Sequence, residues 1–183
     1  HEVIDERAVR ASRQAARLVA PSFQTYSNEY WDKRQMAPGS LLYYIGINKK
    51  LDHVLHHSLF FDTPFDQHAR EIYVTEQWPA DPLYYLSISS LTDPDAAPEG
   101  CENLVFLIPV AAGLEGDTEE LRMKYLDMIL ERFAKHTGHD IRENIIYCKT
   151  YGHSDFINDY HAFKGNAYGL ANTLMQTAVL KPS

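Results

Sequence analysis

The chain has 183 residues, which is enough for one domain with a substantial core. Its hydrophobic content of 45% and charged content of 23% are typical of a folded protein and exclude wholesale disorder. The formal net charge of -8 argues against nucleic acid, which is bound through clustered Lys and Arg, and against electrostatic docking on anionic lipid.

The first quarter of the chain predicts a helix, a connector and a strand. A loose apolar stripe among charged residues indicates a helix over 2–19, which Pro21 ends. Residues 23–31 are typical of a polar-aromatic connector, and the turn at 37–40 leads into an apolar run at 41–47. We interpret that run as a buried strand.

The middle of the chain predicts three more strands and a short helix. Residues 56–61 have the composition of a strand, and Pro64 precedes a helical pattern over 65–74. Two further strands are predicted at 83–89 and 104–110. Because an Asp- and Pro-rich loop joins them without a helix, we expect them to be antiparallel neighbours.

The strongest helix prediction is 118–137, which Thr118 or the preceding Asp can cap and Gly138 can end. A last strand at 144–150 and a short helix over 155–163 follow. Together these elements predict an α+β fold, with a mixed, largely antiparallel sheet and helices packed on one face. No repeat or low-complexity linker marks a second domain, so residues 1–183 are expected to form one.

Histidines and acidic residues at short spacing raise the question of a metal site. They form two groups: His53, His56 and His57, and His153, Asp155, Asp159 and His161. A site needs three or four ligands converging on one ion. His56 and His57 are adjacent at a strand start and should point to opposite faces, so we predict no metal. Cys101 and Cys148 lack metal or disulfide spacing and are expected to be free thiols of a cytoplasmic protein.

Three acidic residues, Glu99, Asp155 and Asp159, are candidate general acids or bases. The competing interpretation is structural: Asp155 as a helix cap and Glu99 in a turn. No hydrolase signature, P-loop or GxGxxG fingerprint occurs. This chain alone should therefore not hold a dinucleotide by the usual glycine-turn mechanism.

Several segments, in the same order along the chain, resemble those of the bacterial-type phytoene desaturases. The C-terminal run SDFINDYHAFKGNAYGLANTLMQTAVLKPS is similar to the family segment that returns to the flavin domain. The other segments with a counterpart in the family are 31–47, 56–61, 92–100 and 103–110. The resemblance extends from Tyr26 onward.

This resemblance implies the substrate-side domain of an amine-oxidase-like flavoenzyme that desaturates a long isoprenoid hydrocarbon such as phytoene. FAD would do the redox chemistry, so no catalytic side chain is assigned. Gly165, Asn166, Tyr168 and Gly169 would lie near the flavin, while both halves of the FAD-binding domain would lie outside this chain. The chain is thus expected to be a fragment that binds no FAD alone.

Other interpretations stay open. The parent protein can be a carotenoid isomerase or another amine-oxidase-like flavoenzyme, and the chain can be a free-standing apolar-ligand or interaction module. If the sheet lines a tunnel for the hydrocarbon, its face opposite the helices should be unusually apolar. That face should then be either open or buried by self-association into a homo-oligomer. The sequence contains no run of about 18 apolar residues, the length needed to span a bilayer. We therefore expect a cytoplasmic protein, with peripheral association at the inner face of the membrane as one option.

Overall fold

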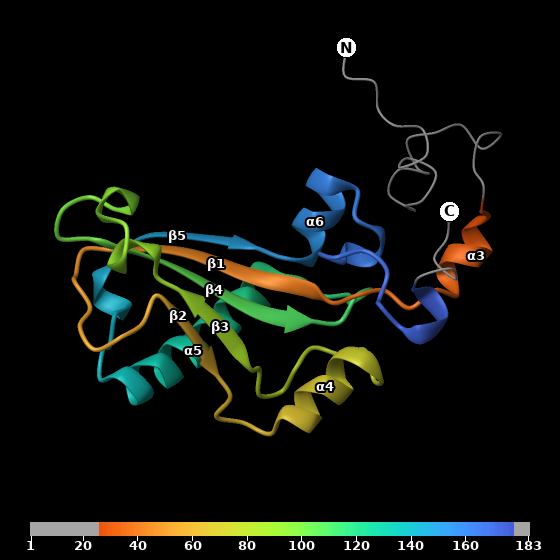
Figure 1. The fold of residues 1–183 in the computed structure, drawn as a ribbon, viewed down its shortest axis with the longest axis horizontal. Helices are drawn as coiled ribbons and strands as arrows, with labels where there is room; N and C mark the ends of the chain where they lie inside the picture. The colour runs from red at the N-terminus through yellow and green to blue at the C-terminus, as the bar shows by residue number, and fades with distance from the viewer. Residues whose placement is uncertain (1–25, 178–183) are drawn as a thin grey trace, which may run out of the picture.

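The computed structural model describes residues 26–177. Five strands form one antiparallel sheet in the order β2-β3-β4-β1-β5 (Figure 1). The strands are β1 (Gly39–Ile47), β2 (His57–Phe60), β3 (Tyr84–Ser87), β4 (Glu102–Val110) and β5 (Ile145–Tyr151). The α-helices of this part are α3 (Asn28–Asp32), α4 (Phe65–Tyr73), α5 (Glu119–Thr137) and α6 (His153–Tyr160).

The α+β fold and its antiparallel sheet are confirmed. Each predicted strand is present with ends shifted by a few residues, and β3 pairs antiparallel with β4 as expected. The connector expected at 23–31 is wrong over α3, where the Ser27 side chain accepts a hydrogen bond from the Tyr30 amide and starts a short helix. The helix predicted at 2–19 lies outside the described residues.

Helix α5 has the predicted caps. The Thr118 hydroxyl accepts from the Leu121 amide at 3.2 Å, and Gly138 ends the helix with a φ of 78°. Its apolar side packs on one face of the sheet, where Phe133 is fully buried and meets Phe106 of β4 edge to face. None of the helices within residues 26–177 is both long enough and apolar enough to cross a bilayer.

Three buried tyrosines connect the core to the backbone. The hydroxyls of Tyr43, Tyr84 and Tyr125 donate to the carbonyls of Arg122, Ile129 and Pro79. Burial raises the pKa of Tyr125 to about 12 and raises those of Tyr43 and Tyr84 further. These rings therefore contribute apolar area without leaving a buried polar group unpaired.

Side chains alternate between the two faces of the sheet. Along β4 every second residue from Glu102 to Val110 is buried, whereas the residues between them are only half-buried. The face that α5 packs against is the covered face, and we call the opposite one the open face. Helix α6 follows β5 and lies close to β1, whereas α4 follows β2 and lies close to β4 (Figure 1).

Candidate functional site: the open face of the sheet

One continuous apolar row crosses all five strands on the open face. The strand register pairs Leu59 with Tyr85, Tyr85 with Leu107, Leu107 with Leu42, and Leu42 with Tyr151. With about 4.8 Å between strands, the row is about 19 Å long. Leu59 is 65% exposed, and the other four members are half-buried. We call these five residues the apolar row.

The neighbouring row along the strands is more polar. It contains His57, Ser87, Val105, Tyr44 and Lys149, again one residue from each strand. The His57 ring accepts from or donates to the Tyr85 hydroxyl at 2.5 Å, so the polar tip of that tyrosine is engaged away from the apolar row. An elongated apolar ligand therefore finds its longest uninterrupted contact across the strands rather than along them.

A hollow of about 450 Å³ lies at one end of the apolar row, and we call it the α6 hollow. Its lining comes from β1, β5, α6 and the segment after α6: Leu42, Tyr44, Tyr151, Phe156, Tyr160, Ala162, Asn166 and Ala167. Tyr151 stacks edge to face on Phe156, and its hydroxyl donates to Asp159 at 2.9 Å. This end therefore combines aromatic surface with polar groups.

A second hollow, of about 240 Å³, lies at the other end, between the sheet and α4. It is lined almost entirely by carbon, from Pro38, Leu59, Phe61, Phe65, His68, Ala69, Ile72, Tyr73, Leu83, Tyr84, Tyr85 and Pro109. We call it the α4 hollow. Because Leu59 and Tyr85 belong to both, it continues the apolar row directly.

His68 fixes α4 against the sheet without offering a free polar atom. Its Nε2–H donates to the Pro109 carbonyl at 2.9 Å, and its Nδ1 accepts from the Leu83 amide at 3.0 Å. This pairing requires the neutral ring, since a protonated Nδ1 cannot accept. Burial lowers the pKa of His68, consistent with that state.

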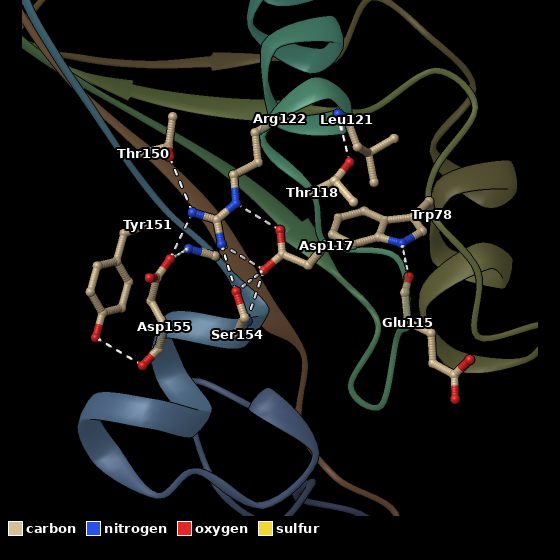
Figure 2. A network of polar contacts seen from close by, with 11 residues as sticks. Trp78, Glu115, Asp117, Thr118, Leu121, Arg122, Thr150, Tyr151, Ser154 and Asp155 are labelled. Atoms are coloured by element: carbon tan, nitrogen blue, oxygen red, sulfur yellow. Dashed lines mark hydrogen bonds and ion pairs between the residues drawn. The ribbon is translucent and has the colours of Figure 1, made fainter.

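The α6 side is held by charges instead (Figure 2). The Arg122 guanidinium donates both Nε–H and Nη2–H to Asp117 at 2.7 Å, and it also contacts Thr150, Ser154 and, at 2.7 Å, Asp155. Burial alone would raise the pKa of Asp117, but hydrogen bonds from Arg122 and Ser154 hold it below its ordinary value. The network joins α5, β5 and α6, and so sets the wall of the α6 hollow.

The four predicted site residues lie in one turn, with different roles. Gly165 is buried at a φ of 58°, and a Cβ there would lie 2.4 Å from the His153 ring. The Asn166 side chain is buried; it donates to the Phe163 carbonyl and accepts from the Gly169 amide. Tyr168 is 67% exposed, and Gly169 has a φ of 84° with open space beside it.

Backbone bonds place this turn beside the start of β1. The amides of Ala37 and Ala171 donate to Gly169 and Gln35, and the Ala167 amide donates to Pro38. Asn166 and Ala167 also line the α6 hollow. The turn therefore borders the end of the apolar row.

Flavin would meet only part of this turn. Gly165 and Asn166 are used within the chain, against His153 and in closing the turn. Tyr168 and Gly169 are accessible and could contact a planar ring. The sequence has no glycine fingerprint for a pyrophosphate, so this turn does not form a dinucleotide site by itself.

The other candidate residues have structural surroundings. Asp155 accepts from the Gly152 amide at 2.8 Å at the start of α6, in agreement with a capping role, and also pairs with Arg122. Glu99 is exposed in the loop before β4. Cys101 and Cys148 are free.

The expectation that His56 and His57 point to opposite faces is wrong. Their rings stack at 4.0 Å, because His56 precedes the first paired residue of β2 and strand alternation does not apply to it. Their Nδ1 atoms bond the hydroxyls of Thr92 and Tyr85. Between residues 26 and 177, no three His, Cys, Asp or Glu side chains gather as a metal site would require.

An open, apolar face on an antiparallel sheet is typical of domains that bind an elongated hydrophobic ligand or a protein partner. Sequence comparison narrows this class. The chain is 40% identical over 181 residues to the carotenoid 3,4-desaturase of Haloarcula japonica, an alignment that covers 98% of the chain and 36% of that protein. It is 31% identical over 136 residues to the 4,4'-diaponeurosporene oxygenase of Staphylococcus haemolyticus, covering 73% of the chain and 27% of that protein.

A third relative is the phytoene desaturase (lycopene-forming) of Pantoea ananas, 26% identical over 166 residues, covering 88% of the chain and 33% of that protein. No family model matches the chain. The chain therefore belongs to the family of carotenoid and phytoene desaturases, and the expected resemblance is confirmed. It spans about a third of the length of the curated relatives it matches.

Proposed function

We propose that this chain is the substrate-side domain of a two-domain, FAD-dependent carotenoid desaturase, and that its open face holds the polyene. The observation that carries the proposal is the apolar row, which exposes leucine and tyrosine side chains across all five strands and ends in a hollow on each side. A long hydrocarbon offers no charge or hydrogen bond, so only a surface of this kind can retain it.

Desaturation removes two hydrogen atoms from neighbouring carbons and turns a C–C single bond into a C=C double bond. When bound, FAD would accept the two electrons. The residues of this chain would position the substrate: Leu42, Leu107 and Tyr151 would hold the polyene against the sheet. Tyr168 and Gly169 would let a flavin ring approach the α6 hollow. With the two electrons FAD would also take up the two hydrogens, as FADH2, and no catalytic side chain of this chain is assigned.

The FAD-binding part would lie in the remaining length that the relatives have and this chain lacks. The chain on its own should bind FAD negligibly, since its turn offers only the edge of a site. In the whole protein the open face would be covered by that part or by a second copy. Because the substrate dissolves in membranes, peripheral association at the inner face of the bilayer belongs to the same proposal.

A second candidate reaction is oxygenation of a similar polyene. One of the relatives, at 31% identity, is an oxygenase by name. The apolar row suits either reaction, because both need the same hydrocarbon to be held. Product analysis separates them: a new double bond lengthens the absorbing polyene, whereas oxygenation adds oxygen to the product mass.

The test uses the protein at the full length of its relatives, incubated with phytoene, 4,4'-diapophytoene and 4,4'-diaponeurosporene, with products separated by chromatography. We expect a desaturated product from at least one substrate. Replacing Leu107 in the middle of the row, as Leu107→Asn, should lower kcat/KM at least about tenfold. The matched variant Val105→Asn, on the same strand and face, should lower it much less. Full activity in Leu107→Asn would show that the open face does not bind the substrate.

A further inference from the structure

We propose that the α4 hollow receives one end of the polyene and measures its length, so that it decides which bond lies beside the turn at residues 165–169. This inference rests on the proposed function and adds to it a specificity-determining site. The ligand class is a linear isoprenoid with an unsubstituted hydrocarbon end.

The first argument is continuity. Leu59 and Tyr85 belong both to the apolar row and to the lining of the α4 hollow, and Leu42 and Tyr151 belong both to the row and to the α6 hollow. Leu107 joins the two pairs in the sheet register. One straight ligand across the strands therefore enters both hollows.

The second argument is the chemical difference between the two ends. The α6 hollow has polar groups at its rim, including the Tyr151 hydroxyl bonded to Asp159, and it borders the turn with Tyr168 and Gly169. In the α4 hollow both nitrogens of His68 are bonded, to Pro109 and Leu83, so the ring offers no free donor or acceptor. An apolar end group gains from the α4 hollow and a polar one is penalised there.

The third argument is that the α4 hollow has a fixed end. His68 ties α4 to β4 and to the residue before β3, and Glu71 of the same helix accepts from the Ala80 amide and from the Gln67 side chain. The side chains of His68 and Glu71 are both buried. A wall held in this way cannot retreat from a longer ligand, and the distance from it to the turn selects the reacting carbon.

The small residue Ala69 on this wall gives the test. In the full-length protein, Ala69→Leu fills part of the hollow and should weaken binding of phytoene relative to the shorter 4,4'-diapophytoene. A mismatch of one or two methyl groups in an apolar pocket should change the ratio of the two binding affinities at least about tenfold. Ile72→Ala enlarges the same hollow and should shift the ratio the opposite way. Binding is measured by competition against lycopene, followed by its absorption.

The control is Arg70→Leu, on the same helix but outside the hollow, which should leave the ratio unchanged; thermal unfolding of each variant shows whether α4 is intact. Equal weakening of both ligands, or no change in either, in an intact Ala69→Leu variant overturns the length-measuring role. Binding is a separate readout from turnover. A shifted binding ratio in a protein that desaturates nothing would support the hollow and refute the proposed reaction.

Discussion

The covered and open faces of the sheet carry similar side chains but leave them in different surroundings. On the covered face Tyr43 and Phe106 are fully buried, and the Tyr43 hydroxyl bonds the Arg122 backbone. On the open face Leu59 is 65% exposed and Tyr44 is 39% exposed. Apolar area that is covered within the chain stabilises the fold, whereas apolar area left open is available for a ligand. The comparison teaches that residue type alone does not separate the two roles.

The largest expected effect tests this comparison on stability. Phe133→Ala opens a cavity under the covered face and should lower the free energy of unfolding by about 3–5 kcal/mol. Leu107→Ala leaves no closed cavity and should cost no more than about 1 kcal/mol. Denaturant unfolding of both variants measures the difference. A loss in Leu107→Ala as large as in Phe133→Ala would mean that the open face is covered in solution, by self-association.

A middle-sized effect separates two glycines beside the α6 hollow. A Cβ at Gly165 would overlap the His153 ring, so Gly165→Ala should cost about 2–3 kcal/mol. Gly169 has open space, and Gly169→Val should cost only the strain of its positive φ, about 1–2 kcal/mol.

Turnover distinguishes the roles of these glycines further. If Gly169 lies against the flavin ring, Gly169→Val in the full-length protein should lose far more activity than its stability loss explains, with flavin absorbance as a second readout. An active, slightly destabilised Gly169→Val variant would limit this glycine to shaping the turn.

The smallest expected effect is a dependence of stability on pH. Burial lowers the pKa of His68 and His153 below the ordinary value of 6.5. The unfolded chain therefore takes up protons first, and the stability that the neutral rings contribute is present above pH 6.5 and lost as the pH falls through their folded pKa. Arg132 lowers the pKa of His68 further, while Glu71 opposes the shift.

Unfolding free energies between pH 7.5 and 5.5 measure this loss. His68→Gln retains a donor and an acceptor but does not titrate, so it should show a shallower pH dependence than the unchanged chain. An identical slope in both proteins would exclude His68 as a contributor.

Local patterns in the sequence predicted much of the fold. Helix α5 was predictable from Thr118 and Gly138, because capping depends on neighbouring backbone groups. The strands were predictable from short apolar runs between turn residues, although their ends shifted by a few residues. The stack of His56 on His57 was not, since alternation holds only where strand pairing begins.

The family also followed from the sequence, because ordered motifs along one chain carry that information without a structure. The site did not. Leu59, Tyr85, Leu107, Leu42 and Tyr151 are spread along the chain, and only the strand register makes them one row. The roles of Arg122 and His68 could not be predicted from a motif, because their hydrogen-bond partners come from other segments of the chain. Sequence determines what each residue can do locally, whereas long-range pairing decides which residues share a face and whether that face is covered.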